Sequence, residues 1–258
     1  MKKYFSMTDI YNDLSKVAVT AHRGASYSCP ENTIPAMEQA IAGGADFIEF
    51  DLRMTSDGIP VVIHDDTIDR TSDGTGRLKD HTLSELKEYN FSWFVRDARQ
   101  KKPVFERLEI PSFEDILKAF RHRVFMNIQI YTENVEDLDA ICALYQQYEM
   151  YDLAYLTIAD WDIAKRVRKT DPRIDICMTP GWHERILPEN LRRCHEFGCR
   201  FVQPIWDSLN AGTIKLCREL GLYENIFYAD TPEGFKRLLD LGVRGIMTNR
   251  PEELRLFL

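Results

Sequence analysis

The strongest constraint on the fold of this 258-residue chain is a regular alternation along its sequence. Short apolar runs rich in β-branched residues, typical of buried strands, alternate with longer stretches whose apolar residues recur at helical spacing. The nine predicted strands are residues 17–21, 46–52, 60–64, 125–130, 153–158, 173–178, 200–205, 225–229 and 243–248. Strands joined through helices form parallel sheets, because the helix returns the chain to the starting edge. The sequence therefore predicts an α/β fold around a parallel sheet.

One connection between predicted strands departs from this alternation. Strands 46–52 and 60–64 are joined by a short segment with Asp57 and Gly58, which is too short for a parallel crossover and typical of a hairpin turn. The other eight strands then belong to strand–helix units, and eight such units in about 250 residues are typical of a TIM-type (β/α)8 barrel. A doubly wound open sheet is the alternative, disfavoured because no glycine-rich fingerprint follows the first strand.

Residues 65–110 form the longest departure from the alternation. The segment is polar, contains the turn-forming run DGTG, and includes one aromatic-rich and one basic stretch. No tract rich in Gly, Ser and Pro marks a linker on either side of it. We therefore expect a single domain over residues 1–258, a barrel with a small insertion at about 65–110.

Charge and composition exclude several classes of protein. The 33 basic and 41 acidic residues give a formal net charge of −8, whereas proteins that bind nucleic acid neutralise its phosphates with Lys and Arg. No apolar run approaches the ~20 residues of a membrane span, and the N-terminus lacks the apolar stretch of a secretory signal. The six cysteines stand singly, without a CxxC pair, so we expect reduced thiols, a cytoplasmic location and no zinc site. Nothing in the sequence indicates the oligomeric state.

Two acidic residues on the second predicted strand are candidates for metal binding. Glu49 and Asp51 are two residues apart, so both side chains point to the same face of the sheet. Two carboxylates on one face inside a barrel would repel each other and be costly to desolvate, and a bound cation relieves both problems. Oxygen ligands favour a hard ion such as Mg²⁺ or Ca²⁺. The alternative is that this face points to solvent.

Histidine and arginine residues stand at neighbouring strand ends, where the active sites of barrels lie. His22 ends the first strand and His64 ends the hairpin strand, and two histidines beside a cation can act as general acid and general base near neutral pH. Arg23 has the geometry for a bidentate contact with a phosphate. The alternatives are histidines in ordinary surface or core positions and an arginine in a surface salt bridge.

These motifs together resemble the glycerophosphodiester phosphodiesterase family. The resemblance rests on HRG (22–24), PENT (30–33), the stretch 45–76, IPSFEDIL (110–117) and GVRGIMTNRP (242–251). It implies a TIM-type barrel with a small insertion after the second histidine. It also implies that His22 and His64 correspond to the catalytic acid/base pair.

The resemblance assigns further roles around these histidines. Arg23 corresponds to the phosphate contact, and Glu31 in the ENT segment is expected to orient Arg23 or the outer shell of the metal. Glu49 and Asp51 correspond to ligands of one divalent cation, Mg²⁺ or Ca²⁺, with Mn²⁺ as a further option. Family members usually read N-I-E-I-K on the fourth barrel strand, and here Gln129 replaces the metal-binding Glu of that pattern.

The other departures from the family pattern fall near the expected substrate. Tyr131 replaces the lysine of N-I-E-I-K, so the site loses one anion and one cation together, and we expect weaker metal binding at Gln129. The family's W-T-V-N reads F-Y-A-D at 227–230, and its T-D-R-P reads T-N-R-P at 248–251. These changes indicate an altered leaving-group pocket. Candidates for its aromatic wall are Trp161, Trp182, Trp206 and Tyr228, with core or lid packing as the alternative role, and Tyr131 and Trp206 are expected to contact the substrate.

The sequence thus predicts a metal-dependent hydrolase of a glycerophosphodiester or a related small phosphodiester, giving an alcohol and a phosphomonoester. Two alternatives remain: a non-catalytic barrel that binds a phosphodiester or phosphosugar, and the same chemistry on a sugar phosphodiester. The sequence does not decide which histidine is the acid, or whether water or a substrate hydroxyl is the nucleophile.

Overall fold

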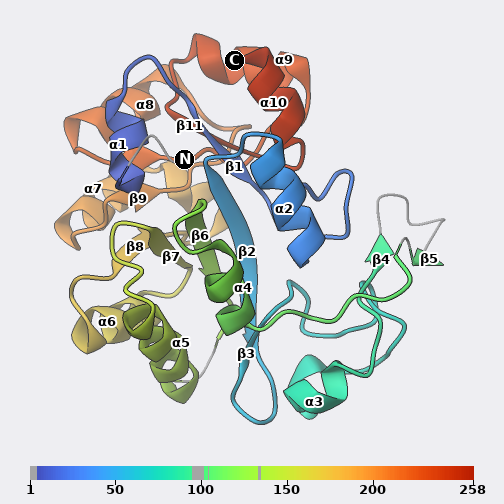
Figure 1. Cartoon of the computed structure of the whole chain (residues 1–258). Helices are drawn as coiled ribbons and strands as arrows, with labels where there is room; N and C mark the ends of the chain where they lie inside the picture. Colours follow the sequence, from blue (N-terminus) through green and yellow to red (C-terminus); the bar gives the residue numbers. More distant parts are fainter. Residues whose placement is uncertain (1–4, 95–101, 104, 133–134) are drawn as a thin grey trace.

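A nearly closed barrel of eight parallel strands forms the centre of the computed structural model, which describes residues 5–94, 102–103, 105–132 and 135–258 (Figure 1). Its strands are β1 (Ala18–Ala21), β2 (Phe47–Met54), β6 (Phe125–Ile130), β7 (Ala154–Ile158), β8 (Asp175–Met178), β9 (Phe201–Val202), β10 (Tyr223–Glu224) and β11 (Gly245–Thr248). The gap between β10 and β11 is bridged at Ile226, whose amide bonds to the Gly245 carbonyl and whose carbonyl accepts from Met247. The predicted barrel is confirmed, and the alternative of an open sheet is wrong.

The strand predicted at 225–229 begins earlier than expected, at β10. Residues 225–229 follow it in an irregular conformation that makes single bridges, from Ile226 to Ile246 and from Phe227 to Ile205. Apolar content identified the right segment, but the backbone there switches between neighbouring strands rather than continuing one ladder.

Helices cover the outside of the barrel (Figure 1). They are α2 (Ile34–Ala42), α4 (Phe113–Phe120), α5 (Val135–Gln147), α6 (Trp161–Thr170), α7 (Pro188–Glu196), α8 (Ala211–Glu219), α9 (Pro232–Asp240) and α10 (Pro251–Phe257). Polar caps fix several starts: the Thr33, Ser112 and Asp160 side chains accept hydrogen bonds from amides of the first turn. A short additional helix, α1 (Met7–Asn12), packs its Tyr11 ring against Phe47 and Phe201 in the barrel interior.

The hairpin predicted after β2 is present. Strand β3 (Pro60–Val62) pairs antiparallel with β2, with Leu52 opposite Val62. The chain then leaves the barrel and forms η1 (Leu78–Asp80), α3 (Leu83–Leu86), β4 (Trp93–Phe94) and β5 (Lys102–Pro103). Figure 1 shows this segment beside the barrel, where it packs around its own small apolar cluster. Residues 95–101 and 104 of the predicted insertion lie outside the described residues, and the assignment of the whole chain to one domain stays a prediction.

Polar side chains fill the interior of the barrel above an aromatic layer. Tyr155 stacks on Phe201 with ring centroids 4.3 Å apart. Next to them, the Thr157 hydroxyl donates to Asn127 Oδ1 at 2.5 Å, and the Asn127 amide donates to Gln203 Oε1 at 3.3 Å. Buried polar groups are stable only when they are hydrogen-bonded, and this network supplies the bonds for the polar side chains inside the barrel.

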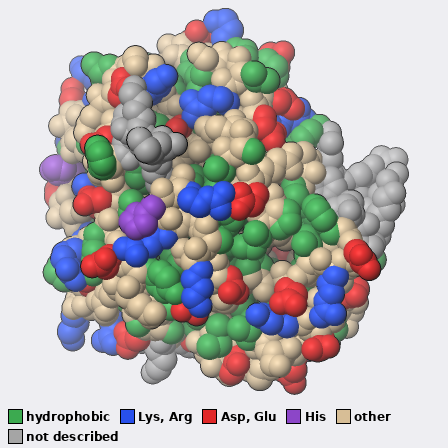
Figure 2. Space-filling model, in the orientation of Figure 1, with side chains coloured by type: hydrophobic (Ala, Val, Ile, Leu, Met, Phe, Trp, Pro, Cys, Tyr) green, Lys and Arg blue, Asp and Glu red, His purple; other side chains and the backbone are tan. Residues whose placement is uncertain are grey.

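The surface carries charges of both signs, and the cysteines are unpaired and buried. Acidic and basic side chains are interspersed over the face shown in Figure 2, with apolar side chains scattered between them. All six cysteines are buried and free. Within the described ranges, no helix combines the length and the apolar character needed to cross a bilayer. The cytoplasmic location stays a prediction.

Candidate active site

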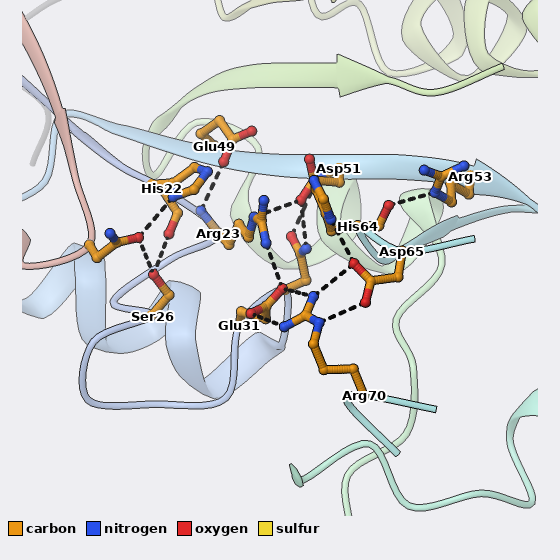
Figure 3. Close-up of polar contacts among 12 residues, drawn as sticks. His22, Arg23, Ser26, Glu31, Glu49, Asp51, Arg53, His64, Asp65 and Arg70 are labelled. Atoms are coloured by element: carbon orange, nitrogen blue, oxygen red, sulfur yellow. Dashed lines mark hydrogen bonds and ion pairs between the residues drawn. The ribbon is translucent and has the colours of Figure 1, made fainter. Parts of the chain in front are cut away.

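Two buried carboxylates lie along the middle of β2, on its interior face (Figure 3). Glu49 is 4% exposed and Asp51 is 1% exposed. Burial, together with the neighbouring charge of Asp51, raises the pKa of Glu49 well above its ordinary value. In the barrel, Asp51 stands opposite Gln129 of β6 in the parallel register. The three residues expected to bind a metal are therefore on adjacent strands, with Asp51 and Gln129 at one level and Glu49 two residues earlier, opposite Asn127.

The turn after β1 brings Arg23 to these acids. Arg23 and Gly24 both have positive φ, +57° and +80°. A side chain at position 24 would also lie 2.7 Å from the Ala36 carbonyl carbon, so this turn requires glycine. The turn directs the Arg23 amide to Glu49 Oε2 at 2.9 Å and brings Arg23 Nε to 3.2 Å from Asp51 Oδ2.

Glu31 joins Arg23 to a second arginine. Its carboxylate accepts from Arg23 Nη1 at 2.8 Å and from Arg70 Nη1 and Nη2 at 2.7 and 2.8 Å. Burial alone would raise the pKa of Glu31, but hydrogen bonds from Arg70 and the charge of Arg23 outweigh it and lower this pKa to about 2. Glu31 is therefore ionised at neutral pH, and its negative charge holds the Arg23 guanidinium in place.

The series of ion pairs continues from Arg70 to the second histidine (Figure 3). Arg70 Nε donates to Asp65 Oδ2 at 2.6 Å, and the bonds from Arg70 hold the pKa of Asp65 well below its usual range. Asp65 Oδ1 lies 2.7 Å from His64 Nδ1. Because an ionised carboxylate can only accept, His64 Nδ1 carries the proton of this bond. Sequence analysis did not select Asp65 or Arg70, although both lie in the HDDTIDR run that carried the resemblance.

His22 has a different kind of partner. Its Nδ1 lies 2.8 Å from Asn249 Oδ1, while Asn249 Nδ2 donates to Asp230 Oδ2 at 2.5 Å and Ser26 Oγ donates to Asn249 Oδ1 at 2.8 Å. Asp230 therefore orients the amide so that its oxygen faces His22, and His22 Nδ1 must donate. Burial and then the charge of Arg23 lower the pKa of His22 to about 4. The neutral ring keeps the lone pair of Nε2 free.

Gln129 and Tyr131 follow one another along the interior face of β6 and its extension. Gln129 Nε2 donates to the Thr157 carbonyl at 3.2 Å. The Tyr131 ring lies between the Arg53 guanidinium, 4.7 Å from the ring centroid, and the His64 ring, 5.4 Å away edge to face. The structure thus brings Tyr131 together with the second histidine and adds Arg53, a residue that the sequence analysis did not select.

Trp206 lies on the rim of the barrel, farther from the acids. Its amide bonds to the Phe227 carbonyl at 2.9 Å, and the Arg237 guanidinium lies 5.4 Å from its ring. Phe227 itself packs edge to face against His22 at 5.2 Å and against Trp182 at 5.6 Å. Phe227 therefore links the two tryptophans to the first histidine.

Oxygen donors for a divalent cation lie on the neighbouring strands β2 and β6. Glu49, Asp51 and Gln129 offer oxygen atoms from adjacent strands, which suits a hard ion such as Mg²⁺ or Ca²⁺. Arg23 Nε lies 3.2 Å from Asp51 Oδ2 as an ion pair without the alignment of a hydrogen bond. Position 129 carries an amide in place of a third acid. The described residues contain no group of three or more His, Cys, Asp or Glu arranged for a metal. The donor set fits a divalent cation, held by fewer charges than three acids would supply.

Comparison with known proteins places these features in a family. Residues 22–253 match the model of the glycerophosphoryl diester phosphodiesterase family. A glycerophosphodiester phosphodiesterase of Bacillus subtilis is 29% identical, over 92% of this chain and 85% of that protein. One from Caldanaerobacter subterraneus is 30% identical, over 93% and 96%. In structure, an Oleispira antarctica phosphodiesterase in complex with the product sn-glycerol-3-phosphate has a TM-score of 0.83 at 20% identity, covering 96% of this chain and 98% of that one.

Proposed function

This chain belongs to the glycerophosphoryl diester phosphodiesterase family, and from this premise we propose that it hydrolyses glycerophosphodiesters at the carboxyl end of the barrel, with two histidines as base and acid. It is an enzyme, a phosphoric diester hydrolase. The relative with bound sn-glycerol-3-phosphate supports this phosphomonoester as the product and an alcohol as the leaving group. The observation that carries the proposal is the ion-pair series that joins the second histidine to the buried acids of β2, running through Asp51, Arg23, Glu31, Arg70, Asp65 and His64. His22 stands directly before Arg23 in the chain.

A divalent cation at Glu49, Asp51 and Gln129 is part of the proposal. When bound, such an ion would neutralise negative charge that develops on the phosphoryl oxygens. The burial of Glu49 and Asp51 on one face of β2 supports this assignment, because a bound cation offsets the repulsion and the desolvation of the two carboxylates. Arg23, held by Glu31, would contact a phosphoryl oxygen through the guanidinium nitrogens that these acids leave available.

The two histidines have unequal surroundings, and we assign their roles from this difference. His22 faces an amide and the positive charge of Arg23, so it remains neutral and accepts the proton of the nucleophile at Nε2. His64 Nδ1 donates to the Asp65 carboxylate, which orients the ring, and we assign to His64 the proton that passes to the departing alcohol. Attack forms the new phosphorus–oxygen bond, and the bond to the alcohol oxygen breaks as that oxygen takes the proton from His64.

Glu31, Tyr131 and Trp206 are proposed to serve the substrate in different ways. Glu31 positions Arg23 and does not need to contact the substrate itself. Tyr131 borders His64 and is proposed to line the leaving-group side. Trp206, connected to His22 through Phe227, is proposed to line the outer rim near the entering substrate.

The proposal is tested with a panel of glycerophosphodiesters and sugar phosphodiesters, incubated with Mg²⁺, Ca²⁺, Mn²⁺ or EDTA and followed by phosphorus NMR. We expect sn-glycerol 3-phosphate from the glycerophosphodiesters and loss of turnover in EDTA. The amide at Gln129 favours a second candidate, a barrel that binds phosphodiesters without cleaving them. Binding of the panel without turnover on any substrate and metal would support that candidate and contradict the proposed hydrolysis.

A further inference from the structure

Arg53 differs from the other arginines at this site in how its charge is balanced. Arg23 pairs with Glu31 and Asp51, and Arg70 pairs with Glu31 and Asp65. The Arg53 side chain makes one hydrogen bond in the described structure, from Nε to the His64 carbonyl at 2.6 Å, and no carboxylate of a described residue pairs with it. Its terminal nitrogens can therefore donate to an anion that comes from outside the chain.

The position of Arg53 is fixed by the alternation of β2. Arg53 follows Glu49 and Asp51 at intervals of two residues, so it belongs to the same face, one step nearer the open end of the barrel. The bond to the His64 carbonyl and the contact with Tyr131 hold its guanidinium beside the second histidine (Figure 3). Tyr131 is 37% exposed, so this corner of the site is open to solvent and to a ligand.

The guanidinium also covers an aromatic face. It lies 4.7 Å from the Tyr131 ring centroid, within the range of a cation–π contact. Aromatic faces are the usual receptors for quaternary ammonium groups. Here the receptor face is already occupied by a cation, and a second cation would meet repulsion in addition to a blocked ring.

These contacts give the leaving-group side of the site a charge preference. We propose that Arg53, held by Tyr131, selects glycerophosphodiesters whose departing alcohol carries a carboxylate or phosphate over those whose alcohol carries an ammonium group. The inference rests on the proposed function, because it requires that His64 protonate the departing alcohol and so places that alcohol beside Arg53. An anionic group there would accept hydrogen bonds from the free guanidinium nitrogens.

Three matched substrates test the inference: sn-glycerol 3-phosphate esters of ethanolamine, ethylene glycol and 3-hydroxypropionate. Their leaving alcohols have the same two-carbon spacing and end in a cation, a neutral hydroxyl and an anion. We expect kcat/KM to rise in that order, with about tenfold between neighbours, a difference of ~1.4 kcal/mol. In Arg53→Gln the three values should converge, and in Arg53→Glu the order should reverse.

The matched control is Arg123→Gln, which removes a guanidinium 5.2 Å from the Phe120 ring, before the start of β6 at the other end of the strands. It should keep the wild-type order. An unchanged order in Arg53→Glu, or wild-type preference for the ethanolamine ester, would overturn the selection by Arg53. Equal loss on all three esters in Arg53→Gln would also overturn it, by showing that Arg53 supports His64 alone. Hydrolysis of none of the esters by the wild type would contradict the proposed function itself.

Discussion

His22 Nδ1 donates to Asn249 Oδ1 across 2.8 Å, and the Asn249 amide in turn donates to the Asp230 carboxylate. The Asn249 amide therefore separates this carboxylate from His22. His64, in contrast, bonds directly to the carboxylate of Asp65. A neutral amide fixes the tautomer of a histidine and stabilises its protonated form less than a carboxylate does. This difference between the two partners is the basis for assigning His22 as the base and His64 as the acid.

Moving the carboxylate next to His22 should change the pH dependence of turnover. As a general base, His22 is active when deprotonated, so the acidic limb of kcat/KM should rise as the pH passes its pKa of about 4, while the limb on the basic side reports the general acid. In the double variant Asn249→Asp with Asp230→Asn, the carboxylate contacts the ring and favours its protonated form. The acidic limb should then move up by about 1–2 pH units. The measurement is kcat/KM from pH 4 to 9.

The double variant has the same net charge as the wild type, so a shifted limb cannot result from a change in net charge. Asp230→Asn alone removes the group that orients the Asn249 amide, and we expect a lower kcat with the acidic limb in its original position. If the limb of the double variant coincides with that of the wild type, His22 is not the base.

Removing each histidine should separate acid from base. His22→Ala and His64→Ala should each lower turnover of an alkyl glycerophosphodiester by about 10²–10⁴-fold. With a p-nitrophenyl ester the leaving group needs no proton, so His64→Ala should recover most of the activity and His22→Ala should not. Both melting temperatures should stay close to that of the wild type, because both side chains are only partly buried. Recovery in His22→Ala instead would reverse the assignment.

The arrangement of the barrel could be predicted from local patterns in the sequence. Helical spacing and buried strand runs predicted its eight parallel strands, and the short Asp57 and Gly58 connection predicted the antiparallel pairing of β3 with β2. These features depend on residues close together in the chain, and the hydrophobic pattern records them directly. The two-residue spacing of Glu49 and Asp51 likewise predicted one shared face.

The partners of the histidines could not be predicted in this way. Asn249 is 227 residues from His22, and its contact exists because β1 pairs with β11 in the closed barrel. The substitutions at 230 and 249 looked like two unrelated departures from the family pattern, but the structure shows Asp230 and Asn249 hydrogen-bonded to each other. Arg53 was missed because a half-buried arginine near a strand end has no distinguishing local signal until Tyr131 is found against it.

Restoring an acid at position 129 should strengthen metal binding. Gln129→Glu would place a third carboxylate opposite Asp51, on the strand next to Glu49 and Asp51, and additional charged ligands bind divalent ions more tightly. Without metal the three acids repel one another, so the variant should melt at a lower temperature in EDTA and gain more than the wild type from added Mg²⁺ or Ca²⁺. Calorimetric titration measures the affinity. An identical titration of both proteins would place Gln129 outside the set of metal ligands.

The last test concerns Glu31, whose negative charge both stabilises the fold and holds Arg23 in place. Its pKa is lowered from an ordinary value near 4.5 to about 2, so its contribution to the free energy of unfolding is fully present above about pH 4.5 and is lost as the pH falls toward 2. Glu31→Gln should therefore be less stable than the wild type by about 1–3 kcal/mol at pH 7, because Arg23 and Arg70 lose a buried partner.

The difference in melting temperature between Glu31→Gln and the wild type should shrink steadily between pH 5 and about pH 2. Glu38→Gln is the matched control, because Glu38 also pairs with an arginine, Arg123, but on the exposed surface, and exposed pairs contribute only ~0–1 kcal/mol. Its cost should be much smaller at every pH. A cost for Glu31→Gln that is equally small would mean that Arg23 and Arg70 are held by Asp51 and Asp65 without Glu31.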